Sequence, residues 1–220
     1  MGYLDPALKP FLETLKKTEF EDNIPYMYVD TVGKITVGVG HNLSFHKDQK
    51  TLQFVIRRFE RHRVIGGDVG VPIRHERVGK ATSEEIQNDF DFLTLHPGLG
   101  NYHASQLQKY TTVELGQSDI DRLFWIDVDR AIKTTRSTFS KLDSYPVSCQ
   151  AALIDIAFNA GSFNSFRPHF VPAVLGTGHF AKKTVSQRWD SVILHSRRGQ
   201  CSHLRNHTIA QWLRDGQPKD

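Results

Sequence analysis

The sequence predicts an α+β fold that is mostly helical, with a small β-hairpin lobe and a larger helical lobe. Two short β-prone segments, 26–29 and 34–39, flank a turn at Thr31-Val32-Gly33. Apolar residues recur at helical spacing before this hairpin and through most of the chain after residue 81. A hairpin followed by a long run of helices is typical of the α+β class.

The length and composition fit one folded domain over residues 1–220. We expect the hairpin lobe at about residues 20–80 and the helical lobe at about 1–20 and 81–220. Hydrophobic residues make up 39% of the chain, which supplies a core and argues against disorder. The net charge of +4 suits an acidic partner, such as a cell-wall polymer, a nucleic acid or an anionic lipid. No run of 18 apolar residues is present, so we expect no membrane span.

The first helix should run from Pro6 to about Thr18, because apolar residues recur there at Leu8, Phe11, Leu12 and Leu15. Pro25 should end it near Glu21, which then lies close to a helix C-terminus. The negative end of the helix dipole favours a protonated carboxyl group there, as does the like charge of Glu19 and Asp22. A protonated carboxyl is what a general acid must be.

The hairpin places Asp30 and Thr36 on opposing strands close to the turn. Gly33 can supply the positive φ of a tight turn. Gly38 and Gly40 would leave the backbone uncovered, as where a polymer approaches closely.

Eight further segments, seven helices and one loop, are assigned from periodicity, capping and turn signals. Residues 51–63 predict a helix whose other face carries Arg57, Arg58, Arg61 and Arg63 in solvent, and 66–72 is a loop with no phosphate-binding motif. The capping-box pattern from Thr82 to Glu85 predicts a helix over 83–95. Other helices are expected after Ser118, from Pro146 to Asn159-Ala160-Gly161, and over 170–175, 180–194 and 206–214.

Three separated parts of the chain together resemble a known family. Glu21, Asp30 and Thr36 are similar to the Glu-(eight residues)-Asp-(five residues)-Thr pattern of phage-type lysozymes and related bacterial muramidase toxins. The segments 28–33 and 36–41 look like the family's strand-turn-strand element, and 152–161 resembles its buried central helix. The resemblance covers residues 8–43, about 120–162 and, more weakly, 180–213.

The resemblance implies a lysozyme-like fold and a muramidase that hydrolyses the β-1,4 bond between N-acetylmuramic acid and N-acetylglucosamine in peptidoglycan. Glu21 would act as the general acid in an inverting reaction, while Asp30 and Thr36 position the attacking water. Asn159, Gly38, His41 and Arg205 would line the substrate site, with Arg205 matching an arginine near the family's C-terminus that lies by the glutamate. No metal or organic cofactor is implied.

The chain departs from the family where Asp22 replaces the glycine that often follows the glutamate, which leaves Glu19 as a rival acid. Three of the expected site residues also have a structural interpretation: His41 as a structural residue, Asn159 as a helix-capping residue and Arg205 as an ion-pair residue. Two alternatives keep the fold: a non-catalytic wall-binding module, and a lytic transglycosylase. A nucleic-acid binder is a third, but no aromatic stacking motif supports it, and we expect neither nucleic acid nor membrane as a partner.

The N-terminal residues show no secretory signal, so we expect synthesis in the cytoplasm and specialised export to the cell wall, as in phage lysis or type VI secretion. The expected partners are peptidoglycan, a secretion machine and an inhibitor or immunity protein. Cys149 and Cys201 form no metal-ligand spacing and read either as buried free thiols or as a disulfide. The histidines show no i,i+4 pair with an acidic third ligand, so no zinc site is expected.

Overall fold

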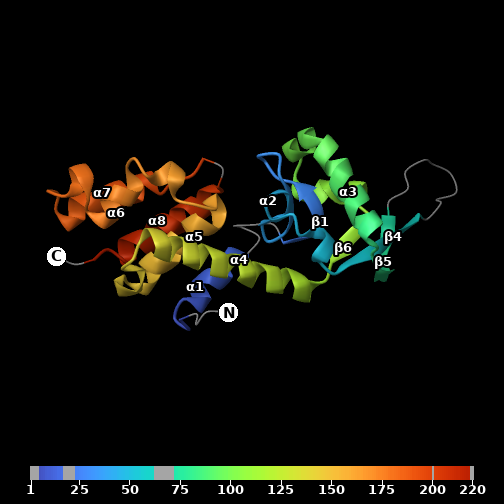
Figure 1. The fold of residues 1–220 in the computed structure, drawn as a ribbon, viewed down its shortest axis with the longest axis horizontal. Helices are drawn as coiled ribbons and strands as arrows, with labels where there is room; N and C mark the ends of the chain where they lie inside the picture. Colours follow the sequence, from blue (N-terminus) through green and yellow to red (C-terminus); the bar gives the residue numbers. More distant parts are fainter. Residues whose placement is uncertain (1–4, 17–22, 62–71, 200, 219–220) are drawn as a thin grey trace. The chain divides into compact units, whose positions relative to one another are not determined.

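The computed structural model describes residues 5–16, 23–61, 72–199 and 201–218, and Figure 1 shows its ribbon. It confirms the α+β class: helices dominate, and six strands form an antiparallel sheet. The chain divides into two compact units, each described by itself. Unit 1 comprises Met1–Glu21 and Trp125–Asp220, and unit 2 comprises Asp22–Phe124.

The sheet lies wholly within unit 2. Its order is β3-β2-β1-β6-β4-β5, and all neighbouring strands are antiparallel. The strands are β1 (Ile24–Val29), β2 (Ile35–Gly38), β3 (His41–Asn42), β4 (Phe54–Arg61), β5 (Pro72–Lys80) and β6 (Val113–Leu115). The predicted hairpin is present as β1 and β2, with Tyr28 opposite Thr36. It is one part of a larger sheet than the sequence suggested.

The helix predicted over 51–63 is wrong, because the chain there forms β4. Leu52, Val55, Ile56 and Phe59 fit a helical period, but Val55, Ile56 and Phe59 are also strong β-formers. Pairing decides the outcome, since β4 is bonded to β5 on one side and to β6 on the other. Of the loop predicted over 66–72, residues 66–71 lie outside the described residues. Its last residue, Pro72, begins β5.

The solvated basic face predicted for this segment is also wrong at Arg57, which is 2% exposed. Its Nη2 donates to the carbonyl of Thr111 at 2.6 Å, and its guanidinium lies 5.1 Å from the centre of the Tyr26 ring. Burial lowers the pKa of Arg57 below its ordinary value, while Glu114, 3.9 Å from Nη1, opposes that shift. The arginine therefore lies inside unit 2 and not on a solvated face. The side chains of Arg58 and Arg61, and Arg63 as a whole, lie outside the described part of the chain.

Helix α3 (Ser83–Leu95) packs against β1, β2 and β6 (Figure 1). Its bounds are as predicted, and Thr82 and Glu85 form the capping box. On its inner side the buried Asp89 accepts hydrogen bonds from the backbone N–H groups of Thr112 and Val113 at 2.6 and 3.0 Å. Unit 2 therefore extends to Phe124. The lobe boundary that we expected near residue 80 falls inside this unit.

Unit 1 is helical throughout its described residues. Helix α4 (Gln117–Thr138) begins in unit 2 and continues into unit 1, whose described residues contain five other α-helices. These are α1 (Lys9–Glu13), α5 (Val147–Ala160), α6 (Phe170–Leu175), α7 (Val185–His195) and α8 (His203–Asp215). The starts of α4 and α5, and both ends of α6, agree with the sequence prediction.

Helix α5 is the core helix of unit 1, as predicted. Every residue from Cys149 to Ala157 is buried, and α8 and α1 pack against it. Gly161 ends the helix in the left-handed conformation, with φ of 70°. The indole of Trp189 on α7 donates to the carbonyl of Leu213 on α8 at 2.7 Å, which ties these two helices together.

Two helix starts differ from prediction because capping residues decide them. Thr184 and Gln187 form a second capping box, so α7 begins at Val185 rather than at Phe180. Ser202 caps α8 and starts it at His203, before the expected Asn206. The first helix ends as a 3-10 turn over Thr14–Lys16, and residues 17–22 are not described. Among the described helices, none is both long and apolar enough to cross a membrane.

Candidate functional site

Glu21, the expected general acid, lies outside the described residues, as do Glu19 and Asp22. In the sequence, Glu21 is the last residue before unit 2. It stands two residues before Asn23, where the described chain resumes, and three residues before the start of β1. The other expected site residues are all described.

Asp30 follows β1 directly and organises the hairpin turn. Its Oδ1 accepts from the backbone N–H of Val32 at 3.0 Å and from that of Lys34 at 2.7 Å. Its own backbone N–H donates to the carbonyl of Lys34 at 2.8 Å. Asp favours such turns because its short side chain can reach backbone donors two residues on. Both side-chain bonds use Oδ1, so Oδ2 is the oxygen that can meet a ligand or a water molecule.

Thr36 lies across the hairpin on β2, opposite Tyr28. Its side chain is 3% exposed, and its hydroxyl donates to the carbonyl of Lys34 at 3.4 Å, near the upper limit for a hydrogen bond. The structure therefore brings Asp30 and Thr36 to the same end of the β1–β2 hairpin, with the carboxylate half-buried and the hydroxyl buried.

Gly38 ends β2 with a positive φ of 63°, a conformation that favours glycine. A Cβ built on it would lie 3.1 Å from Cγ2 of Ile120. The backbone of Gly38 is thus covered by a side chain of its own unit, whereas we expected it to be open to a polymer. The φ angle and the contact with Ile120 explain the glycine without a ligand.

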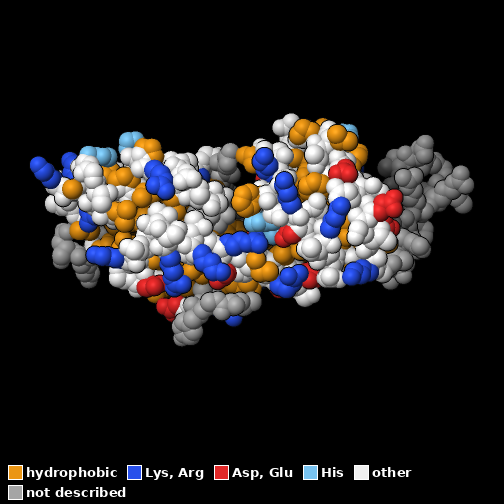
Figure 2. All heavy atoms as spheres, viewed as in Figure 1, with side chains coloured by type: hydrophobic (Ala, Val, Ile, Leu, Met, Phe, Trp, Pro, Cys, Tyr) orange, Lys and Arg blue, Asp and Glu red, His pale blue; other side chains and the backbone are white. Residues whose placement is uncertain are grey.

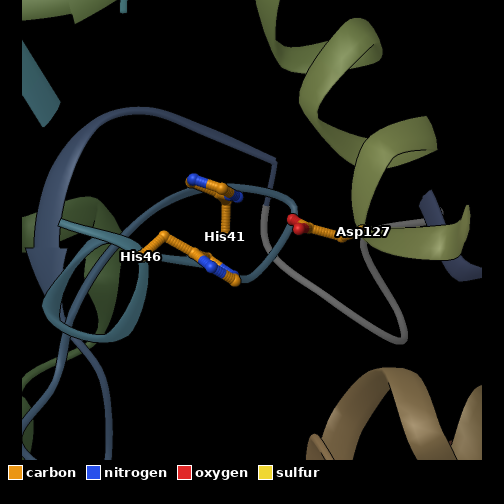
Figure 3. A group of neighbouring side chains, drawn as sticks. All are labelled: His41, His46 and Asp127. Atoms are coloured by element: carbon orange, nitrogen blue, oxygen red, sulfur yellow. The ribbon is translucent and has the colours of Figure 1, made fainter. Parts of the chain in front are cut away.

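His41 begins β3 and is 1% exposed. Its Nε2 lies 3.2 Å from Oδ1 of Asp48, and its ring stacks on that of His46 with centres 4.9 Å apart (Figure 3). His46 belongs to α2 (Leu43–His46), so the pair holds this short helix against the sheet edge. Asp127, the third residue labelled in Figure 3, belongs to unit 1, where Arg130 donates to it at 2.7 Å. These contacts favour a structural role for His41.

Asn159 lies in the last turn of α5 and is exposed. Its side-chain oxygen accepts from the thiol of Cys201 at 3.1 Å. An exposed amide at a helix end can hydrogen-bond the hydroxyl and N-acetyl groups of a sugar. Cys201 is a free thiol, as is the buried Cys149, so the two do not form a disulfide in this structure.

Arg205 is 1% exposed and belongs to a buried ion cluster in unit 1. Its Nη2 and Nε donate to Oδ1 of Asp155 at 2.6 and 3.0 Å, and Nη2 of Arg198 donates to Oδ2 of Asp155 at 2.6 Å. The cluster joins α5, α8 and the segment between α7 and α8. This burial argues against direct contact between Arg205 and a substrate. It supports the alternative interpretation of Arg205 as an ion-pair residue.

The positive charges of Arg205 and Arg198 set the direction in which the pKa of Asp155 is shifted. Burial alone would raise the pKa of this carboxyl group, but Arg205 and Arg198 outweigh burial and hold the pKa below its ordinary value. Asp155 and Arg198 were not among the site residues predicted from the sequence. One signal was available, because an acidic residue in a helix that is apolar almost all round must be paired when it is buried.

The described residues thus form two separate groups with different chemistry. The hairpin end of unit 2 offers a carboxylate oxygen beside a turn, which suits the positioning of a water molecule or a sugar hydroxyl. The buried cluster of unit 1 pairs Asp155 with Arg198 and Arg205 and suits a structural role. No protein-family model matches the chain, and the search of curated proteins finds no significant match.

Proposed function

We propose that this chain is a muramidase that hydrolyses the β-1,4 bond between N-acetylmuramic acid and N-acetylglucosamine in bacterial peptidoglycan. Glu21 protonates the leaving oxygen, and Asp30 with Thr36 positions the water that attacks the anomeric carbon. Two carboxyl groups with unlike surroundings are the minimum that this reaction needs.

The observation that carries the proposal is the state of Asp30. Its turn bonds fix the carboxylate at the end of β1 through Oδ1, and they leave Oδ2 outside the turn. A carboxylate whose rotamer is fixed by backbone donors is preorganised to orient a water molecule. The hairpin itself, the spacing from Glu21 and the buried helix that ends at Asn159-Ala160-Gly161 agree with the family pattern stated above.

The structure bears on the expected roles of five other residues in this proposal. Thr36 acts from a buried position, through a hydroxyl whose present hydrogen bond is long. Asn159 is the exposed one among the four residues expected to line the substrate site, so it can meet a sugar amide. Arg205, His41 and Gly38 support the fold around the site, because each is buried against a side chain of its own unit.

The test is a matched pair of variants assayed on purified cell walls. Glu21→Gln should abolish the loss of turbidity and the release of reducing ends, because the amide cannot donate the proton. Glu84→Gln, an exposed glutamate in the first turn of α3, is the control and should keep full activity. Full activity of Glu21→Gln, with its fold verified by circular dichroism, would contradict the proposal.

Mass spectrometry of the released muropeptides separates the alternatives. Ordinary reducing ends support hydrolysis, whereas 1,6-anhydro ends would identify a lytic transglycosylase. Binding to walls by the wild-type chain without any release of sugar would identify a wall-binding module.

The place of action is part of the proposal: the chain reaches the periplasm of a target or host cell by specialised export, and an inhibitor or immunity protein protects the producing cell. Expression of the chain with a grafted signal peptide should lyse a Gram-negative host, whereas cytoplasmic expression should not. Glu21→Gln with the same signal peptide is the control, and lysis by that variant would argue against wall cleavage as the cause.

A further inference from the structure

Three histidines of unit 1 come together from three different elements. His169 precedes α6, His179 lies in the 3-10 turn Gly178–Phe180, and His195 is the last residue of α7. The rings of His169 and His195 are stacked with centres 4.8 Å apart, and those of His169 and His179 have centres 6.2 Å apart. Figure 2 shows histidine side chains on the surface over α7.

The local fold explains why residues so far apart in sequence meet. Helices α6 and α7 pack against each other, which sets the start of α6 beside the end of α7. Gly176 and Gly178, both with positive φ, turn the chain after α6 so that the 3-10 turn comes back against that helix. The buried Phe180 ring, 3.9 Å from that of His179 between centres, braces the third histidine.

Two of the three ring-to-ring separations are close to those of imidazoles that share one transition-metal ion. A zinc-bound imidazole nitrogen lies about 2.1 Å from the ion, so the centres of two rings in tetrahedral geometry stand roughly 5 Å apart. The observed separations of 4.8 and 6.2 Å fall on either side of this value. Stacked rings do not point at a common centre, but His169 and His179 are exposed and His195 is half-buried. Rotation about the broad χ2 torsion of histidine can therefore make their nitrogens converge.

The imidazole nitrogens are also uncommitted. Within the described residues, none of these three rings makes a hydrogen bond or an ion pair. Neutral imidazole is a good ligand for zinc, copper and nickel, and three imidazoles with water in the fourth position are a known zinc arrangement. We infer that His169, His179 and His195 bind a divalent transition-metal ion, with zinc as the probe ion, on the surface of unit 1.

The experiment is a calorimetric titration of ZnCl₂ into the full chain, without an affinity tag, at pH 7.5. Wild type should bind zinc at this site, and His169→Gln and His195→Gln should each weaken that binding at least about tenfold, since losing even an outer partner of a metal ligand costs 10–100-fold. Lowering the pH to 5.5 should also weaken it, because only neutral imidazole binds the ion.

Two controls make the result specific. His203 and His207 are exposed and lie four residues apart on α8, so they offer a two-ligand site of their own. The double variant His203→Gln/His207→Gln and the exposed unit 2 variant His96→Gln should both keep the zinc site. In long-range nitrogen NMR of the histidine rings, zinc should shift His169, His179 and His195 together. Unchanged affinity in His169→Gln and His195→Gln, or no zinc binding by wild type, would overturn the inference.

Discussion

Asp155 on α5 and Arg205 on α8 form one pair of a buried ion cluster, with Arg205 Nη2 2.6 Å from Oδ1 of Asp155. The other carboxylate oxygen accepts from Arg198, also at 2.6 Å. Two buried guanidinium groups therefore share one carboxylate, and the outcome of removing its charge can be predicted.

Asp155→Asn should lower the free energy of unfolding by about 3–5 kcal/mol, the usual cost of breaking a buried ion pair from one side. The cause is that both buried guanidinium groups lose the carboxylate that they share. Urea unfolding followed by circular dichroism measures this change. Asp143→Asn, which removes an exposed carboxylate paired with Arg136, is the control and should change stability by less than about 1 kcal/mol.

The same cluster predicts a pH dependence. Because the folded-state pKa of Asp155 is lowered, its contribution is complete above the ordinary aspartate pKa of about 3.9 and is lost as the pH falls through the lower folded-state value. The stability difference between wild type and Asp155→Asn should therefore be constant near neutral pH and shrink below about pH 4. A difference that stays constant down to pH 2 would contradict the assigned direction.

Asp89 should behave in the opposite way. Burial raises its pKa, and the hydrogen bonds from Thr112 and Val113 only partly offset that shift. Its contribution to stability is thus complete below the ordinary aspartate pKa and declines as the pH rises through the raised folded-state value. Asp89→Asn should flatten this decline in a series of thermal melts from pH 4 to pH 7, because its amide oxygen still accepts hydrogen bonds and does not ionise.

Asp89→Ala tests the hydrogen bonds themselves. It removes the acceptor of two backbone N–H groups and should cost about 1–3 kcal/mol in unfolding free energy. Asp91→Ala, on the exposed face of the same helix, is the matched control and loses only a contact with Gln87. Equal effects of the two variants would show that Asp89 does not hold α3 to β6.

Two glycines of the hairpin region separate backbone strain from crowding. Gly33 and Gly38 both have positive φ, but a Cβ on Gly33 meets nothing within 4 Å, whereas one on Gly38 meets Ile120 at 3.1 Å. Gly33→Ala should cost about 1–2 kcal/mol from the left-handed conformation alone. Gly38→Ala should cost more, and Gly38→Ala/Ile120→Val should recover part of the excess. Equal costs for both glycines would show that the contact with Ile120 is not tight.

Asp30→Asn tests the proposed catalytic role without breaking the turn. An asparagine oxygen can accept the same two backbone N–H groups, so the melting temperature should stay close to that of wild type. The release of reducing ends from cell walls should fall at least about 100-fold, because the group that positions the water has lost its charge. A loss of activity accompanied by an equal loss of stability would point to the turn instead.

The two cysteines should differ in reactivity. Burial raises the pKa of the Cys149 thiol to about 12, so it forms almost no thiolate at pH 8 and is also covered. Iodoacetamide should modify the half-buried Cys201 in the native protein and reach Cys149 only after unfolding. Mass spectrometry of tryptic peptides measures both sites, and rapid native labelling of Cys149 would contradict its burial.

Where capping residues and periodicity agreed, the sequence predicted the structure well. The bounds of α3 follow from Thr82 and Glu85, and α5 follows from Pro146 and Gly161. The segment 51–63 failed because its apolar spacing fits both a helix and a strand, and only its partners β5 and β6, distant in sequence, choose between them. Local signals contain no information about such partners.

The candidate site divides in the same way. The turn at Asp30 is a local feature, and the spacing to Gly33 was enough to place it. The burial of Arg57 and Arg205 was not visible, because an arginine in isolation looks like a surface residue. The cluster of His169, His179 and His195 was missed for a related reason: its members are 10 and 16 residues apart and meet only after α6 and α7 pack.

The position of β6 has a consequence for how the protein is made. This three-residue strand lies between β1 and β4, and it is the strand that joins the two halves of the described sheet. A nascent chain that has emerged only as far as α3 therefore holds β1 and β4 with no strand to connect them. The sheet can be completed only after Leu115 has been synthesised. Folding of unit 2 therefore requires strand pairings between residues separated by more than half the length of the unit, and it should be slow for a unit of this size. Until that moment the facing edges of β1 and β4 are open, and a ribosome-bound intermediate of this length is the form most exposed to aggregation.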